Sequence, residues 1–204
     1  MPIMKNVAAV ALFVGTAVAM PLLAQDITEP RSGAKFAAKV DDKSLLGAGL
    51  RTKTFLKVHV YALGLYVADS AIPGPLAAYK GKTDSPAFYR ELVQGDFPKQ
   101  VTMKFLRDLS ASQIQEAMRE ALAGADKARI DAFVAYFPAI TSGQECVLKW
   151  APGGTLETVM AGQAKPPISD KAFATAVFGI WLGEKPIQED LKKAIVSRAG
   201  ELIR

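Results

Sequence analysis

Two side chains in the first third of the chain could together bind an anion. Arg51 ends the glycine-spaced run LLGAGLR, and Tyr61 follows ten residues later among alternating hydrophobic residues. A guanidinium group presents a fork of N–H donors that fits a carboxylate, and a phenol can add a third hydrogen bond. The alternative is an exposed arginine and a half-buried tyrosine without a shared role, because both are common in proteins.

The other reactive residue types are scarce. Cys146 is the single cysteine and His59 the single histidine, so the chain can form no internal disulfide and lacks a second histidine for a zinc site. A cysteine in a strand-like run is typical of a small buried side chain. We therefore predict no metal site and no cofactor. His59 shares strand parity with Tyr61 and stays open as a lone acid or base.

The composition indicates one globular domain. Half of the 204 residues are hydrophobic and 22% are charged, which is enough apolar material for a real core. The formal charge of +5 becomes +4 without residues 1–24, whose one charge is Lys5. No dense lysine and arginine stripe with interleaved aromatic residues occurs, so we predict no nucleic-acid partner. An anionic small ligand or a membrane surface remains compatible with this charge.

The first 24 residues have the layout of a secretory signal peptide. Lys5 precedes an apolar run, and small residues lead to Ala24, the predicted cleavage position, with Ala17–Ala19 as the alternative. The run is shorter than the ~20 residues that a spanning helix needs, and Pro21 interrupts it. We predict a mature domain over residues 25–204 that is periplasmic or secreted and has no stable membrane insertion.

Strand patterns surround the two candidate residues. Strands are predicted over 36–40, 45–51, 55–67, 87–94 and 99–106, and a hairpin over 144–150 and 155–161 encloses the turn APGG. A straight strand would separate Arg51 from Tyr61 by about 33 Å, at ~3.3 Å per residue. The pair therefore requires the chain to fold back near Thr52–Phe55.

Helix signals occupy the middle and the end of the chain. A capping box of Ser110 and Gln113 begins one helix, and Leu109 with Ile114 fits a hydrophobic staple. The further helices are a short one near 76–80, one that carries Ile130, Phe133, Val134 and Phe137 and stops before Pro138, one from Ser169 to Gly183, and one that Pro186 opens. Six or seven strands in adjacent antiparallel pairs and four or five helices imply an α+β layer fold.

Longer blocks of the sequence carry a family resemblance. The blocks are GAGLR, YALGLYV, AYKGKTDSPAFYREL, GDFPKQVTMKFLRDLSASQIQEAMREAL and WLGEKPIQEDLKKAI. Together they resemble the chalcone isomerase family, including its bacterial chalcone isomerase-like branch, over about residues 36–204. The resemblance implies an open-faced β-sandwich, with a large antiparallel sheet, helices packed on one face and a ligand cleft between them.

The resemblance also implies which polar groups the plant enzymes of this family use. They close a flavanone ring without a cofactor, by means of an arginine, two threonines, a tyrosine and an asparagine. Only the arginine matches, as Arg51. The first threonine position falls on Tyr61, the tyrosine on Ile114, the asparagine on Ala121 and the second threonine on Ile180. Isoleucine and alanine neither donate nor accept hydrogen bonds, so plant-type isomerisation is not expected.

An arginine beside a tyrosine resembles the fatty-acid-binding members of the family, in which such a pair holds the ligand carboxylate. We therefore predict a non-catalytic or weakly catalytic envelope protein that binds a fatty acid or another lipophilic carboxylate. The predicted ligand-binding residues are Arg51, Tyr61, Ile114, Ala121 and Ile180, with no catalytic residue. The last three are alternatively plain core residues.

Two other functions stay open at this point. The first is a cofactor-independent intramolecular lyase or isomerase, with Arg51 as electrophile and Tyr61 or His59 as acid or base. The second is an interaction protein that keeps the fold while its own side chains fill the cleft. The sequence identifies no protein partner.

Overall fold

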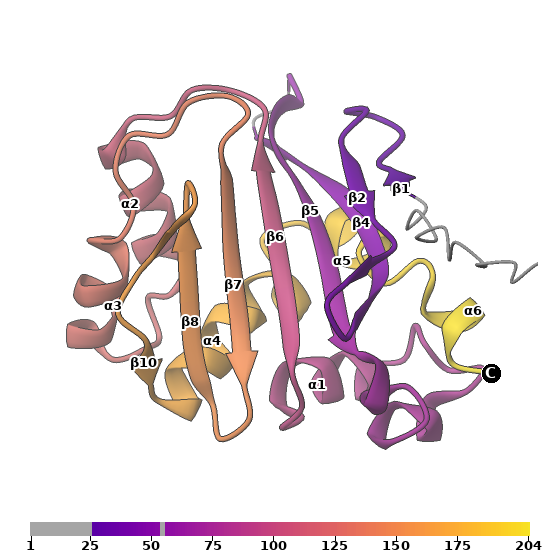
Figure 1. The fold of residues 1–204 in the computed structure, drawn as a ribbon. Helices are drawn as coiled ribbons and strands as arrows, with labels where there is room; N and C mark the ends of the chain where they lie inside the picture. Colours follow the sequence, from indigo (N-terminus) through magenta and orange to yellow (C-terminus); the bar gives the residue numbers. More distant parts are fainter. Residues whose placement is uncertain (1–25, 54–55) are drawn as a thin grey trace, which may run out of the picture.

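A curved antiparallel sheet dominates the structure, a computed structural model that describes residues 26–53 and 56–204 (Figure 1). Its eight strands run in the order β10-β8-β7-β6-β5-β4-β3, with β9 beside β8. A separate antiparallel ribbon consists of β1 and β2. The strand bounds are β1 Asp26–Thr28, β2 Lys35–Ala37, β3 Lys39–Val40, β4 Lys43–Lys53, β5 Val58–Ala68, β6 Lys99–Phe105, β7 Glu145–Ala151, β8 Thr155–Met160, β9 Gln163–Ala164 and β10 Ile168–Ser169.

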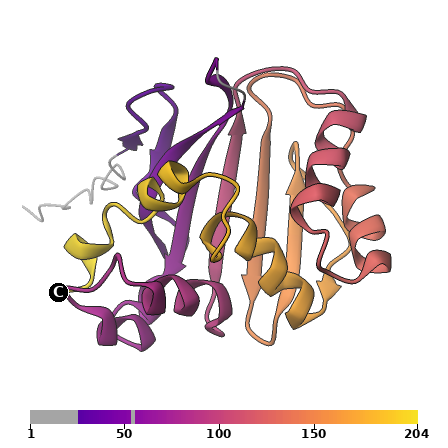
Figure 2. The same cartoon turned by 180° about the vertical axis from the view of Figure 1, so that it is seen from behind.

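The helices cover one face of this sheet. Figure 2, turned by 180° from Figure 1, shows α2, α3, α4 and α5 in front of the strands. The helix bounds are α1 Pro86–Gln94, α2 Ala111–Ala121, α3 Lys127–Val134, α4 Lys171–Leu182, α5 Glu189–Ala194 and α6 Ala199–Leu202, with 3-10 turns η1 Asp69–Ala71 and η2 Pro75–Tyr79. The predicted α+β fold, a large antiparallel sheet with helices on one face, is confirmed.

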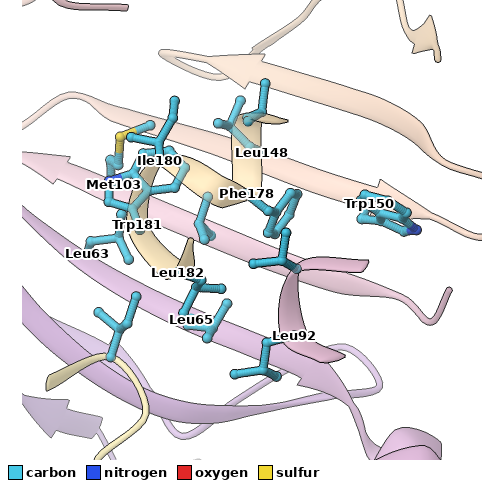
Figure 3. Close-up of a cluster of buried hydrophobic side chains, with 14 of the residues drawn as sticks. Leu63, Leu65, Leu92, Met103, Leu148, Trp150, Phe178, Ile180, Trp181 and Leu182 are labelled. Atoms are coloured by element: carbon cyan, nitrogen blue, oxygen red, sulfur yellow. The ribbon is translucent and has the colours of Figure 1, made fainter. Parts of the chain in front are cut away.

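Helix α4 forms the centre of the core. Seven of its twelve residues are buried, and a helix that is apolar on most sides must lie inside a protein. The strand residues beneath it alternate, so that every second side chain points at the helix. Figure 3 shows this contact, in which Leu63, Leu65, Met103 and Leu148 of the strands meet Phe178, Ile180, Trp181 and Leu182 of α4.

The glycines of LLGAGLR let α5 lie directly on β4. Gly47, Gly49 and Arg51 lie two positions apart along β4, so all three face the same side of the sheet. A Cβ atom on Gly47 would lie 2.5 Å from the carbonyl oxygen of Ala194, and one on Gly49 would lie 2.7 Å from the Cβ of Ala194. Only residues without a side chain fit there, and the segment that precedes α5 consequently reaches Arg51.

The ribbon of β1 and β2 covers part of the opposite face of the sheet. Phe36 packs over Gly64, where a Cβ atom would lie 2.7 Å from the Phe36 ring. Leu45, Ala62 and Tyr66 complete this small second cluster. The helices and the ribbon therefore lie on opposite faces, and the helix face alone bears the candidate residues.

One predicted strand is wrong. Residues 87–94 form the helix α1 instead. The Ser85 side chain accepts a hydrogen bond from the Phe88 backbone N–H (3.3 Å), and Pro86 occupies the first turn, both of which favour a helix start. The buried side chains Phe88, Tyr89, Leu92 and Val93 recur at helical spacing. The short apolar run is compatible with a strand and with a helix, and the helix start at Ser85 and Pro86 decides between them.

Two predicted helix starts are displaced. Asp170 caps α4 in place of Ser169, since its carboxylate accepts the Phe173 backbone N–H at 3.0 Å, and Ser169 belongs to β10. Helix α5 begins at Glu189 rather than at Pro186. Both helices begin within one turn of the predicted position.

The remaining differences concern element limits. The strand predicted over Phe36–Val40 is divided between β2 and β3, Phe137 lies beyond the end of α3, and the helix near Leu76–Lys80 is the 3-10 turn η2. The predictions for residues 1–24 and for Phe55 lie outside the described residues. Every helix that the structure describes is too short or too polar to cross a membrane.

Candidate ligand-binding cleft

Arg51 and Tyr61 are direct neighbours across β4 and β5. The antiparallel register pairs the two residues, so their side chains emerge on the same face of the sheet. That face is the one covered by helices, because Leu63 and Leu65 have the same parity as Tyr61 and pack against α4. The fold-back that the spacing required is the β4–β5 hairpin.

Tyr61 is buried and held by Trp181 of α4. The indole Nε1–H of Trp181 donates a hydrogen bond to the phenolic oxygen of Tyr61 at 2.9 Å, and the Phe105 ring packs edge-on at 5.8 Å. Burial raises the pKa of Tyr61, against the smaller lowering effects of the Trp181 hydrogen bond and the Arg51 charge. An indole only donates, so the phenol accepts here and keeps its own proton for another acceptor.

Gln188 holds Arg51 from the segment before α5. Arg51 Nη1 donates to the Thr52 carbonyl oxygen at 2.7 Å and to Gln188 Oε1 at 3.2 Å. The same amide oxygen accepts the Thr52 backbone N–H at 2.9 Å, and its Nε2 donates to the Leu50 carbonyl oxygen at 3.1 Å. These partners are all neutral. Within the described part of the chain Arg51 forms no ion pair, so its positive charge is available to an anion.

The two side chains line a cleft of about 770 Å³ between the sheet, α2 and α4. Known small-molecule sites have volumes of about 300–1,000 Å³. All five predicted residues contribute to its lining, and Ile114 and Ile180 are buried while Ala121 is exposed at the rim. The other apolar lining residues are Val58, Val60, Phe105, Leu109, Ala117, Met118, Ala176, Trp181 and Ile187. The cleft thus joins an apolar wall to the guanidinium of Arg51 and the phenol of Tyr61. The charged side chains that also line it are Lys53, Arg107, Glu120, Glu184 and Lys185.

Two reactive residues lie outside this cleft. His59 is exposed on β5 and is not among the lining residues, because the register shifts between Arg51 and Thr52. A role for His59 as acid or base in this cleft therefore loses its geometric basis. Cys146 is fully buried, and burial raises the pKa of its thiol, as predicted for a structural cysteine.

A second, larger depression of about 970 Å³ lies between α1 and α5 and contains none of the predicted residues. Lys192 Nζ there donates to the Gly183 carbonyl oxygen at 2.7 Å and lies 4.5 Å from the centre of the Tyr89 ring. This contact closes the end of α4. Lysine, arginine and acidic residues line the depression together, so it offers no preferred ligand charge.

Trp181 and Gln188 are the residues that the sequence prediction missed. Both occur in the block WLGEKPIQ, which contributes to the family resemblance. No local pattern signals that an indole or an amide will meet a residue more than a hundred positions earlier. Membership of that block is the one sequence feature that marks these two residues.

Comparison with known proteins identifies the family of this chain. The sequence model described as "Chalcone isomerase-like" matches residues 32–197. The chain belongs to the chalcone isomerase-like family. Chalcone isomerase-like protein 1 of Humulus lupulus is 31% identical over 179 residues, 76% of this chain and 82% of that protein. Chalcone–flavanone isomerase 1A of Glycine max is 27% identical over 199 residues, 84% of this chain and 87% of that protein.

The fold of this chalcone isomerase-like protein also matches a solved structure. The crystal structure of an Arabidopsis thaliana fatty-acid binding protein aligns with a TM-score of 0.76 and covers 88% of this chain and 99% of that chain. The two sequences are 20% identical over the alignment, so the likeness concerns the fold. The predicted family and fold are both confirmed. The bacterial branch stays a prediction, because the relatives named here are plant proteins.

Proposed function

We propose that this protein binds a fatty acid or another lipophilic carboxylate in the cleft between the sheet, α2 and α4. The observation that carries the proposal is the register pairing of Arg51 with Tyr61 in a cleft whose wall is largely apolar. A carboxylate can accept from the guanidinium and from the phenolic O–H together. The apolar wall, which includes Ile114 and Ile180, can bury an aliphatic chain.

The lining residues favour binding over plant-type catalysis. Ile114, Ala121 and Ile180 bring no donor or acceptor to the positions where the resemblance placed polar groups. Ring closure to a flavanone needs such groups for the phenolate, the developing enolate and a water molecule. The fold relative that is called a fatty-acid binding protein supports the same proposal by analogy of architecture.

Export to a bacterial envelope forms part of the proposal. It rests on the sequence of residues 1–24 alone, with Lys5, the apolar run and the small residues before Ala24. The relatives named above are plant proteins. Localisation of a tagged full-length chain, with sequencing of the mature N-terminus, tests this part separately from ligand binding.

A comparison of a fatty acid with the alcohol of the same chain length tests the binding proposal. Palmitate and hexadecanol have the same chain but differ in the carboxylate, so calorimetric titration of both separates head-group recognition from apolar burial. Arg51→Gln should weaken palmitate binding by roughly 10–100-fold, the range of a hydrogen bond to a charged group, and leave hexadecanol binding unchanged. Arg51→Lys should lose less, because the charge remains.

Arg107→Gln provides the matched control. Arg107 also lines the cleft, but it has no hydrogen bond to Gln188 among the described residues. We expect a smaller loss for this variant than for Arg51→Gln. Equal affinity of the wild-type protein for the acid and the alcohol, or no binding of either, would contradict the proposal.

An intramolecular lyase or isomerase on an unidentified substrate is the second candidate, favoured by the relatives that are named chalcone–flavanone isomerases. Tyr61 would then act as a proton donor, because its raised pKa keeps it protonated near neutral pH. Turnover of chalcones or enones that disappears in Tyr61→Phe would support this candidate. Absence of turnover across these substrates would count against it.

A further inference from the structure

The turn between β4 and β5 exposes an apolar side chain. Leu56 has a relative exposure of 70%, and it is the one large hydrophobic side chain of residues 26–53 and 56–204 that is exposed. Lys57 follows it with a positive φ of 51° and is also exposed. The segment that leads into β5 projects at the top of the molecule in both Figure 1 and Figure 2. We call Leu56 and Lys57 the hairpin tip.

Four exposed cationic side chains lie in the hairpin tip or on the lining of the neighbouring cleft. Lys53 ends β4 beside it, and Arg107 lies at the same end of the sheet, since the Leu106 backbone N–H donates to the Val60 carbonyl oxygen at 3.0 Å. Lys185 comes from the segment between α4 and α5. Lys53, Lys57, Arg107 and Lys185 are all exposed, and none forms an ion pair with another described residue.

The hairpin tip adjoins the mouth of the candidate cleft. Lys53 and Val58, which flank the tip, both line the cleft, as do Arg107 and Lys185. Two carboxylates, Glu120 and Glu184, also line it. With Arg51 included, the lining holds four cationic side chains against these two, so the mouth carries an excess of positive charge next to an exposed leucine.

We propose that the hairpin tip docks on an anionic lipid surface, with Leu56 in the headgroup region and the surrounding lysines and arginine on lipid phosphates. Anionic membranes attract clusters of lysine and arginine, and an apolar side chain adds affinity by leaving water. In this orientation the cleft mouth faces the lipid. A lipophilic ligand then passes between membrane and cleft without crossing bulk water, a step that rests on the proposed function, whereas docking itself does not.

Vesicle sedimentation tests the docking. The protein should bind vesicles of phosphatidylcholine with phosphatidylglycerol, and bind vesicles of phosphatidylcholine alone far more weakly. The binding should fall as salt rises, because screening shortens the reach of the charges. The double variant Leu56→Ser with Lys57→Asn should lower the partition coefficient at least tenfold. Asparagine suits the positive φ of residue 57, so the turn is preserved.

Lys80→Asn is the matched control. Lys80 is exposed and directly follows η2, which lies beyond the opposite end of β5 from the tip. Its substitution removes the same charge and should leave vesicle binding within twofold of the wild type. Equal losses in the tip variant and in Lys80→Asn would mean that net charge alone drives binding, and would overturn the proposal.

A transfer assay separates docking from ligand binding. A fluorescent fatty acid loaded on the protein should leave faster as anionic vesicles are added, and the tip variant should lose that acceleration at unchanged ligand affinity. Ligand binding without vesicle binding would overturn the docking and spare the proposed function. Vesicle binding without ligand binding would overturn the proposed function and leave the docking in place.

Discussion

Trp181 donates its indole N–H to the phenolic oxygen of Tyr61, and 120 positions of sequence separate the two residues. The donor comes from α4 and the acceptor from β5, so the hydrogen bond connects the helix layer to the sheet at the cleft. Because the indole supplies the proton of this bond, it orients the Tyr61 hydroxyl and leaves the phenolic proton for a ligand.

Trp181→Phe keeps an aromatic ring but removes the N–H donor. Affinity for palmitate should fall about 3–10-fold, the value of one neutral hydrogen bond, with hexadecanol affected less. The pKa of Tyr61 should rise further, since the Trp181 hydrogen bond lowers it. Ultraviolet titration of the tyrosines and calorimetry measure the two effects. Trp150→Phe, which removes an indole bound to Asp96, is the size-matched control and should leave both quantities unchanged.

Gln188 is predicted to position Arg51 through its amide oxygen. Gln188→Leu leaves the Thr52 backbone N–H and the Leu50 carbonyl oxygen without this partner, so the free energy of unfolding should fall by about 1–3 kcal/mol. Gln188→Glu keeps an acceptor for Thr52 and places a carboxylate beside Arg51. This variant should be more stable than the leucine variant and yet bind palmitate more weakly, because the guanidinium is already paired. Urea unfolding and calorimetry separate the effects.

Gly47→Ala should displace α5 from β4. The new Cβ would lie 2.5 Å from the Ala194 carbonyl oxygen and 2.8 Å from the Ile195 carbonyl carbon. Both are backbone atoms that cannot rotate away, so we expect a loss of about 1–3 kcal/mol in the free energy of unfolding. Gly124→Ala meets nothing within 4 Å and should change stability little. Equal stability of the two variants would show that α5 moves to accommodate the new Cβ without a loss in the free energy of unfolding.

Lys99 gives the protein a predicted pH dependence. Its side chain is buried, and Nζ donates to the Gly95 carbonyl oxygen at 2.8 Å and to that of Val93 at 3.2 Å. Burial lowers its pKa from 10.5 to about 7. Above pH 7 the folded chain releases a proton that the unfolded chain retains. The free energy of unfolding should therefore rise with pH, by at most about 1.4 kcal/mol per unit.

The useful window for this measurement is pH 7 to 8.5. Above it, unfolding also exposes Cys146, whose folded-state pKa is raised by burial, and this opposes the trend. Urea unfolding of the wild type should show the rise, and Lys99→Met should show a flatter profile. A flat wild-type profile would mean that the two carbonyl oxygens and the Trp150 ring, 4.1 Å from Nζ, keep the amine charged.

Local sequence signals predicted the elements that depend on neighbouring residues. The capping box of Ser110 and Gln113 is present with both hydrogen bonds, Gly183 ends α4, and the turn APGG joins β7 to β8. In each case the atoms that interact are a few positions apart. The strand predicted over residues 87–94 failed because a short apolar run has no unique period.

The sequence by itself determined the family, the alternation of the strands and the need for Arg51 and Tyr61 to meet across a hairpin. Spacing and side-chain chemistry are enough for these, because each depends on one segment and its own periodicity. Only the tertiary structure decided that Trp181 would meet Tyr61 and that Gln188 would meet Arg51 across 137 positions. Those contacts exist because α4 and α5 pack on one face of the sheet, and packing depends on how distant surfaces fit together.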